Sequence, residues 1–289
     1  MESVVRVPRE PFVRGGLEVH QVPAWKDNLV WVLRCVKTNA CAVVDGPLAE
    51  GALELIDGEG WKLTAVLNTH THPDHVGINR DLHRRGRLAG LEVCGPAGDA
   101  TRVPGITKPV DEGDEVRVGE VVGKVWRTDG HLNGHVSFLF DGLLFCGDTL
   151  FGAGCGYLFD GPPEAMAASL RRLATLPEDT LVCCAHEYTE DNLRFAWSVN
   201  PSNAALKARI QTVFALRARG ECSVPSTVGE ERATNPFIRT ADKELRRSVG
   251  EAFERDLTSA SDDDVFAATR ALKDRKDYKS IADNELPVR

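Results

Sequence analysis

The segment "NTHTHPDHVG", residues 68–77, constrains the fold of this chain more than any other segment. It places His70, His72, Asp74 and His75 within six positions, directly after the apolar and β-branched run "LTAVL". Such a run predicts a buried strand, and imidazole and carboxylate groups at the end of a rigid strand are typical metal ligands. Because side chains two residues apart on an extended segment point the same way, His70 and His72 could chelate one ion. We expect Asp74 and His75, on a turn just beyond, to face a second ion.

Three later segments also end a predicted strand in residues of ligand type. They are "TDGHLNGH" with His131 and His135, "FCGDTL" with Asp148, and "CCAHEYT" with His186. A carboxylate has two oxygens, so Asp148 could bridge two ions. Six of the eight histidines fall in these four segments, which argues against chance clustering. The other two, His20 and His83, are expected to be ordinary packed or surface histidines.

Composition and charge exclude several classes of protein. Hydrophobic residues make up 42% and charged residues 27% of the 289 positions, as in a globular protein with one large domain or one domain and an appendage. The net charge of −8 argues against a nucleic-acid-binding surface. No run approaches the roughly 18 apolar residues of a membrane span, and "MESVVRVPREPFVRGG" has no signal-peptide core. We therefore expect a cytoplasmic protein without a membrane partner, while organellar targeting stays open.

The eight cysteines do not form a thiolate metal motif, because no Cys-x-x-Cys pair is present. Several lie in apolar runs such as "LEVC" and "LVCC". This pattern favours reduced thiols in the core of a protein from a reducing compartment. Cys155 follows Asp148 closely in sequence, but we interpret it as structural because it lies in a glycine-rich loop.

Hydrophobic periodicity divides the chain into two parts. Up to about residue 190, predicted strands alternate with helices such as "AEGALELIDGEG", "GINRDLHRRGRLAG" and "PEAMAASLRRLATL". Beyond it the spacing is helical in "EDNLRFAWSV", "NAALKARIQTVFALRARG", "ADKELRRSVGEAFERDL" and "DDDVFAATRALKDRK", with "ECSVPSTVGEERATNPFIR" expected as a loop. The pattern predicts a mixed α/β domain over residues 1–190 and a helical domain over residues 191–289.

The motif "THTHPDH" resembles the His-x-His-x-Asp-His signature of the metallo-β-lactamase superfamily. Within that superfamily the chain is similar to glyoxalase II, the hydroxyacylglutathione hydrolases. The segments that carry the resemblance, from about residue 26 to residue 279, are "THTHPDHVG", "TDGHLNGH", "FCGDTLFGAGCG", "HEYTEDNLRFA" and "VPSTVGEERATNPFIR". The last of these segments points to the glyoxalase II branch. The resemblance implies an αββα sandwich with a two-metal site, followed by a C-terminal helical domain that completes the substrate pocket.

The resemblance also assigns ligands and chemistry. It implies that His70, His72 and His131 hold the first metal, that Asp74, His75 and His186 hold the second, and that Asp148 bridges them. His135 then becomes a residue that supports the ligands or packs beside them. On this resemblance we expect two divalent ions, Zn²⁺ first and Fe or Mn as alternatives, which would supply a hydroxide to attack a thioester carbonyl, so that no protein nucleophile is needed. The implied reaction turns S-D-lactoylglutathione, or a related acyl thiol, into a hydroxy acid and a free thiol in methylglyoxal detoxification.

The substrate-binding residues match the family less completely. Tyr188 matches a family tyrosine, whereas Lys273 and Lys276 fall where the family places a basic pair, with arginine usual at the first position. The family usually has Lys or Arg where this chain has Tyr157, and often tyrosine where it has Phe159. These departures leave the thiol carrier open. The expected partner is a small-molecule thioester, and we expect a monomer.

Two other functions fit parts of the pattern. One is a persulfide dioxygenase with a single iron, but Asp74, His75 and His186 argue against a one-metal site. The other is a catalytically silent relative with a binding or regulatory role, which only the changes at Tyr157 and Phe159 favour.

Overall fold

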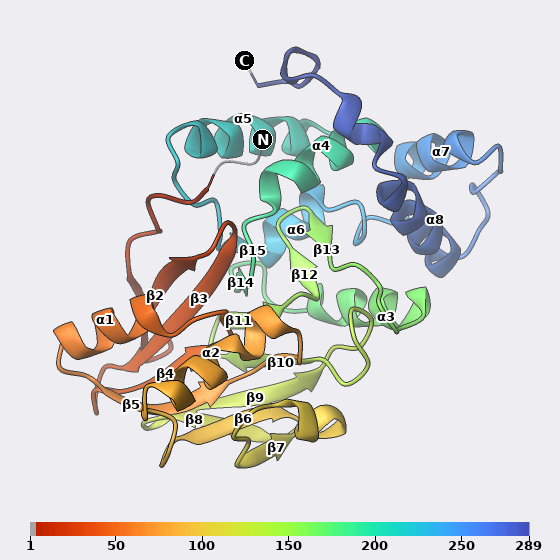
Figure 1. Ribbon diagram of the computed structural model, residues 1–289. Coiled ribbons are helices and arrows are strands. Elements are labelled where there is room, and N and C mark those ends of the chain that lie inside the picture. The colour runs from red at the N-terminus through yellow and green to blue at the C-terminus, as the bar shows by residue number, and fades with distance from the viewer. Residues whose placement is uncertain (1–3, 289) are drawn as a thin grey trace.

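The computed structural model describes residues 4–288, and two β-sheets packed face to face form its centre (Figure 1). In these residues the first sheet has seven strands in sequence order: β1 (Phe12–Arg14), β2 (Leu17–Ala24), β3 (Asn28–Cys35), β4 (Ala40–Val44), β5 (Lys62–Leu67), β6 (Glu92–Pro96) and β7 (Lys108–Val110). From β4 to β7 the strands are parallel. The helices α1 (Glu50–Gly58) and α2 (Pro73–Arg84) cover the outer face of this sheet, which explains why β3 and β4 bury nearly all of their side chains, on both faces.

The second sheet has six strands within the described residues. Their order is β15 (Ser226–Thr227), β14 (Leu181–Cys184), β11 (Leu143–Gly147), β10 (Val136–Phe140), β9 (Val121–Arg127) and β8 (Glu115–Val118). A short hairpin, β12 (Leu150–Phe151) and β13 (Gly154–Cys155), leaves this sheet after β11. The large apolar side chains Trp31 from the first sheet and Phe138 and Phe145 from the second are fully buried between the sheets.

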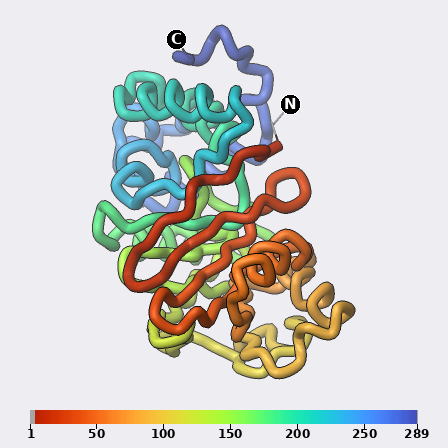
Figure 2. Tube along the Cα trace, turned by 90° about the vertical axis from the view of Figure 1, so that its left-hand side faces the viewer, coloured from red at the N-terminus to blue at the C-terminus, as the bar shows by residue number. Residues whose placement is uncertain are grey.

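The helices of the C-terminal part gather at one end of the sandwich (Figure 2). They are α4 (Thr189–Val199), α5 (Ala204–Ala218), α6 (Val228–Thr234), α7 (Lys243–Ala252) and α8 (Asp262–Arg275), and α8 packs against α3 (Pro163–Leu173). Short 3₁₀ segments cover Ala97–Arg102, which is kinked at Asp99, and Asp277–Ser280 and Asp283–Glu285. Figure 2 also shows the N-terminal segment running up to this end, where Val7 pairs with Glu221.

Two details of the predicted elements are wrong. Asp74 and His75 lie in the first turn of α2 and not on a turn before it, because the helix begins at Pro73, whose fixed φ suits a first helical position. The segment at residues 221–239 is not a plain loop, because it contains β15 and α6. The helix α6 starts with a capping box in which Thr227 and Glu230 bond to each other's backbone N–H groups.

The predicted αββα sandwich and its helical extension are confirmed. The extension is joined to the sandwich, since β15 of the C-terminal part pairs with β14. The domain boundary near residue 190 stays a prediction. Residues 1–3 and 289, which are the outer ends of the two predicted domains, lie outside the described residues. None of the helices in residues 4–288 combines the length and apolar character that crossing a bilayer requires.

Candidate metal centre

The seven predicted ligands come together as two adjacent groups. The first contains His70, His72, His131 and Asp148, and the second contains Asp74, His75 and His186; within each group the ligand atoms lie within 4.8 Å of one another. These seven residues follow the ends of β5, β9, β11 and β14 or lie in the first turn of α2. Residues far apart in sequence therefore meet at one edge of the sandwich.

In the first group three imidazole nitrogens converge on one point. Nδ1 of His72 lies 3.1 Å from Nε2 of His70 and 3.0 Å from Nε2 of His131. Burial lowers the pKa of each of these three rings, most strongly for His70. Neutral rings present lone pairs to one another, and a cation at their centre would satisfy all three.

Asp148 faces both groups with different oxygens. Its Oδ2 lies 3.5 Å from Nε2 of His131, and its Oδ1 lies 3.4 Å from Nε2 of His75 and 3.5 Å from Nε2 of His186. Oδ1 is buried and has no hydrogen-bond partner among residues 4–288. Because a buried acceptor without a donor is costly, this oxygen fits a bound cation. The donor set is thus suited to two divalent ions bridged by one carboxylate.

The second group contains more negative charge around its histidines. Nε2 of His186 lies 3.3 Å from both Nε2 of His75 and Oδ2 of Asp74, and Asn28 donates to the same Asp74 oxygen at 3.0 Å. Burial lowers the pKa of both rings, but nearby carboxylates raise it by more. They are Asp148 and Asp45 for His75, and Asp148, Asp27 and Asp74 for His186. The pKa of His75 is therefore well above its usual range, and that of His186 is raised to about 9.

Three histidines have oxygen atoms close behind their rings. Nδ1 of His131 donates to the carbonyl of Tyr157 at 2.7 Å, and Nδ1 of His186 lies 3.0 Å from Oδ1 of Asp27. Nδ1 of His75 lies 3.0 Å from Oδ2 of Asp45. A proton on Nδ1 directs Nε2 of each ring towards the ligand group, where its lone pair could bind a cation that replaces a second proton.

Sequence reasoning missed Asp27 and Asp45. Asp45 is buried and also accepts hydrogen bonds from the backbone N–H of Thr69 at 2.9 Å and from its hydroxyl at 2.7 Å. An aspartate at the end of the apolar run "CAVVDG" was the available signal, because a buried carboxylate needs partners. Asp27 lies in an ordinary polar turn, and nothing in the sequence there indicated a role at the ligand groups.

His135 lies beside the first group and outside both. Its ring stacks on His70 with centroids 4.9 Å apart, its Nδ1 lies 3.0 Å from the Thr128 hydroxyl, and its Nε2 accepts the Asp148 N–H at 3.3 Å. Of the two remaining histidines, His20 lies 2.8 Å from a Glu18 oxygen, and His83 is exposed on α2. Neither contacts the ligand groups, as expected.

Aromatic side chains flank the centre. The Phe159 ring lies 4.8 Å from His72 and 5.2 Å from His131, and Tyr157 lies 5.0 Å from Phe159. These two side chains are 52% (Tyr157) and 60% (Phe159) exposed, so a ligand could reach both. At the second group Tyr188 stacks on His186, with centroids 4.7 Å apart and the rings nearly parallel.

The two lysines expected to bind substrate differ in exposure. Lys276 is exposed just after α8, whereas Lys273 is buried and donates to Asn192. Burial lowers the pKa of Lys273 to about 7. A substrate carboxylate could reach Lys273 only if its contact with Asn192 opened.

The eight cysteines are free and buried, in agreement with the prediction of core thiols. Burial raises the pKa of Cys155, whose Sγ lies 3.8 Å from a guanidinium nitrogen of Arg270. A thiol with a raised pKa is a poor nucleophile, which fits a structural role.

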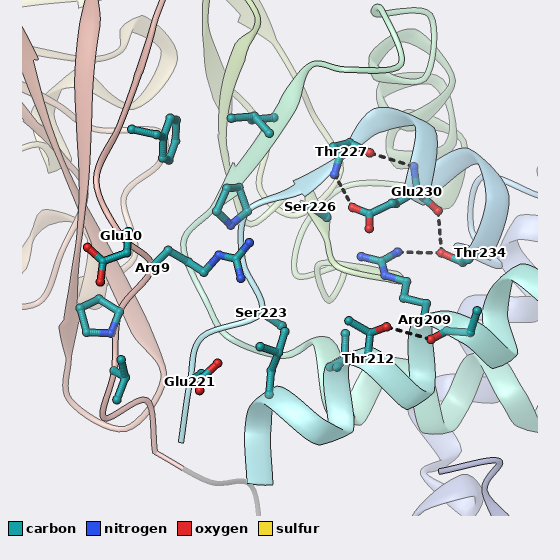
Figure 3. Close-up of a pocket in the computed structure, with 18 of the residues that line it drawn as sticks. Arg9, Glu10, Arg209, Thr212, Glu221, Ser223, Ser226, Thr227, Glu230 and Thr234 are labelled. Atoms are coloured by element: carbon teal, nitrogen blue, oxygen red, sulfur yellow. Dashed lines mark hydrogen bonds between the residues drawn. The ribbon is translucent and has the colours of Figure 1, made fainter. Parts of the chain in front are cut away.

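A large cavity, shown in Figure 3, lies away from the ligand groups. It measures about 1170 Å³ and lies between the N-terminal segment at residues 7–12 and the helices α5 and α6. Its lining includes Arg9, Arg209 and Thr234 but none of the predicted site residues. The candidate site is therefore defined by its ligand chemistry and not by cavity size.

Comparison with known proteins gives matches over both parts of the chain. Residues 25–186 match the family described as the metallo-β-lactamase superfamily, and residues 187–276 match the C-terminus of hydroxyacylglutathione hydrolase. The hydroxyacylglutathione hydrolase of Rhodospirillum rubrum is 45% identical over 260 residues, which cover 89% of this chain and 98% of the relative. That of Methylococcus capsulatus is 46% identical with the same coverage. A metallo-β-lactamase structure from Staphylococcus aureus shares the fold, with a TM-score of 0.60 and 19% identity over 90% of this chain and 72% of that one.

Proposed function

The chain belongs to the hydroxyacylglutathione hydrolase family of the metallo-β-lactamase superfamily, and on this premise we propose that it is a metal-dependent thioester hydrolase. It converts a small-molecule thioester into a hydroxy acid and a free thiol. The substrate that we propose is S-D-lactoylglutathione or a related acyl thiol, the reaction of methylglyoxal detoxification.

The position of Asp148 carries this proposal. Its two oxygens are divided between the ligand groups, so that one carboxylate serves both. We propose that His70, His72 and His131 bind one ion, that Asp74, His75 and His186 bind the other, and that Asp148 bridges them. Imidazole and carboxylate ligands suit Zn²⁺ best, with iron or manganese as alternatives.

Two divalent ions held here would supply a Lewis acid for the thioester carbonyl and a water acidified towards neutrality. The protein's part is to fix the geometry. Tyr157, Asp27 and Asp45 hold the rings of His131, His186 and His75, so that little reorganisation is needed during the reaction. A thiolate is a good leaving group, so the proposal requires no general acid from the chain.

We propose that the thiol carrier and the acyl group contact the aromatic side chains around the centre. Tyr157 and Phe159 are exposed beside the first group, and Tyr188 lies against His186 of the second. Lys276 is exposed and free to approach a carboxylate of the carrier, while Lys273 would have to leave Asn192 first. Tyr157 and Phe159 bring no cation to the substrate, so the carrier could be a thiol other than glutathione.

The test is a thioester hydrolysis assay on lactoylglutathione and acyl esters of other thiols, with His72→Ala as the control. Turnover of at least one ester, lost in the control and accompanied by two metal ions per chain, is the expected result. One iron per chain with oxygen consumption would instead support a persulfide dioxygenase. No turnover above His72→Ala on any ester would favour a silent binding protein.

We also propose a cytoplasmic location and a monomeric state. The eight free, buried thiols fit a reducing compartment, where disulfides are rare. Fractionation of cells and the mass of the purified chain in solution would test the two points separately.

A further inference from the structure

The β12–β13 hairpin occupies a sensitive position beside the first ligand group. It begins two residues after Asp148 and leads through Gly156 to Tyr157, whose carbonyl orients His131. Gly156 is packed so closely that a Cβ there would lie 2.1 Å from the Asp148 carbonyl oxygen and 2.9 Å from Nδ1 of His131. A shift of this hairpin would therefore displace the backbone that supports two ligands.

Side chains from the C-terminal part hold the turn of this hairpin residue by residue. Asn192 of α4 donates to the carbonyl of Gly152 at 3.0 Å, and Arg270 of α8 donates to that of Cys155 at 3.2 Å. The two middle residues of the turn, Ala153 and Gly154, are bonded by Glu231 of α6 and by Asn235, which follows α6. Glu231 accepts the N–H of Ala153 at 2.8 Å, and Asn235 donates to the carbonyl of Gly154 at 2.9 Å.

The backbone of the turn needs such support. Ala153 has a φ of +54°, in the left-handed region that residues with a side chain rarely adopt. Such a conformation persists only where the surroundings hold it. The Glu231 carboxylate and the Asn235 amide are also bonded to each other at 3.0 Å, so the two act on the turn as one unit.

The Glu231 carboxylate is fully buried, and both of its oxygens are used. Oε1 accepts from Arg209 and from the Ser226 hydroxyl, each at 2.6 Å, and Oε2 accepts from Ala153 and Asn235. Arg209 and Ser226 come from the wall of the large cavity (Figure 3). Packing alone would not need a buried charge, because apolar residues usually fill such a position at least as well. The carboxylate is explained by the acceptor that it offers to Ala153.

We propose that Glu231 and Asn235 are positioning residues for the metal centre. They lock the β12–β13 turn, and through it they set the Tyr157 carbonyl that orients His131 and the backbone beside Asp148. The helical part would then serve the metal site as well as the substrate. This inference rests on the proposed function, since it takes the first ligand group to bind a metal ion.

The test compares two positioning variants with two controls in the full-length, zinc-loaded chain. The variants are Glu231→Gln and Asn235→Ala. The first control is Glu230→Gln, which changes a neighbouring glutamate on the same helix whose carboxylate is exposed and only caps the helix. The second is Arg209→Met, which breaks the buried ion pair with Glu231 at the carboxylate oxygen that does not bond to the hairpin. Chelator competition measures metal retention, and urea unfolding of the chelator-treated chain measures stability.

We expect the two positioning variants to lose one of the two zinc ions at about 10- to 100-fold lower chelator concentration than the wild type. Arg209→Met should lower the urea midpoint at least as much as Asn235→Ala, yet keep its zinc. Glu230→Gln should change neither measurement by a comparable amount. If metal retention follows the urea midpoint across all four variants, the role is purely structural and the inference is overturned.

Amide hydrogen exchange separates this inference from the proposed function. The Ala153 N–H should exchange at least about tenfold faster in Asn235→Ala than in the wild type, whether or not metal is bound. A wild-type chain that bound no zinc would overturn the proposed function. The exchange result would still test whether Glu231 and Asn235 stabilise the β12–β13 turn. An Ala153 amide that exchanges equally fast in both chains would overturn the inference itself.

Discussion

The ligand groups and the substrate side of the same centre are held in very different ways. His70 and His75 are buried, and His70, His75, His131 and His186 each have an oxygen atom close to the ring nitrogen that points away from the ligand group. Tyr157 and Phe159 are more than half exposed and contact their neighbours mainly through ring edges. The ligands of the metal centre are thus preorganised by many buried contacts. In our proposal the choice of substrate depends on a few exposed side chains, which could change without disturbing the ligands.

The largest expected effect is at the carboxylate that both groups share. Asp148→Asn removes its charge, and we expect kcat/KM for the thioester to fall more than about 100-fold, beyond the range for residues that only support ligands. The number of metal ions per chain should fall as well. Steady-state kinetics and elemental analysis measure the two effects. His83→Ala, on the exposed face of α2, is the control, and equal activity of the two variants would contradict the bridging role.

The next largest effect is expected at Asp27, whose carboxylate lies behind the proposed ligand His186. Asp27→Ala removes the acceptor for Nδ1 of His186, and we expect metal affinity to weaken about 10- to 100-fold. Asp57→Ala is the matched control, because Asp57 pairs with Arg87 on the surface of α1. Competition with a metal-binding dye gives both affinities. If the two aspartates behaved alike, His186 would not depend on Asp27 for its orientation.

Among the residues proposed to bind substrate, Lys273 differs from Tyr157 and Phe159 in being buried. We expect its burial to affect the free energy of unfolding. Its pKa is about 7 in the folded chain against an ordinary value near 10.5, so between these values the unfolded chain binds more protons. The free energy of unfolding should therefore rise with pH in this interval, by about 2 kcal/mol from pH 7 to pH 9. Lys273→Met should lack this rise, as urea titrations at the two pH values would show. The exposed Lys279→Met should retain it, and parallel curves for wild type and Lys273→Met would refute the prediction.

The smallest effect is expected at the exposed rim. Tyr157→Lys adds a cation beside the first group, and an exposed ion pair contributes about 0.2–1 kcal/mol. KM for glutathione thioesters should then fall up to about fivefold, with no change for esters of an uncharged thiol. Val122→Lys adds the same charge to an exposed apolar position on β9 and should leave both KM values unchanged. A fall in KM for the uncharged ester as well would show that charge is not the cause.

Much of the site could be predicted because ligand chemistry is local. His70, His72, Asp74 and His75 are identifiable by type and spacing, and the strand that carries them by its apolar run. The helix α2 starts at Pro73, four residues before the predicted start at Gly77, because the fixed φ of proline suits the first helical position. The burial of Lys273 could not be predicted either, because its spacing on α8 equally fits a solvated face.

The sequence by itself determined the ligand types, a mixed α/β domain followed by helices, and the thiols of the core. Each of these follows from side-chain chemistry or from hydrophobic periodicity over a few residues, whereas the αββα sandwich was implied by the resemblance to the metallo-β-lactamase superfamily. Only the tertiary structure decided that Asp148 divides its oxygens between two groups, that Asp27 stands behind His186, 159 residues away, and that Glu231 holds Ala153. The physical reason is that a hydrogen bond depends on distance and angle between two atoms. Sheet packing, and not sequence spacing, brings such atoms together.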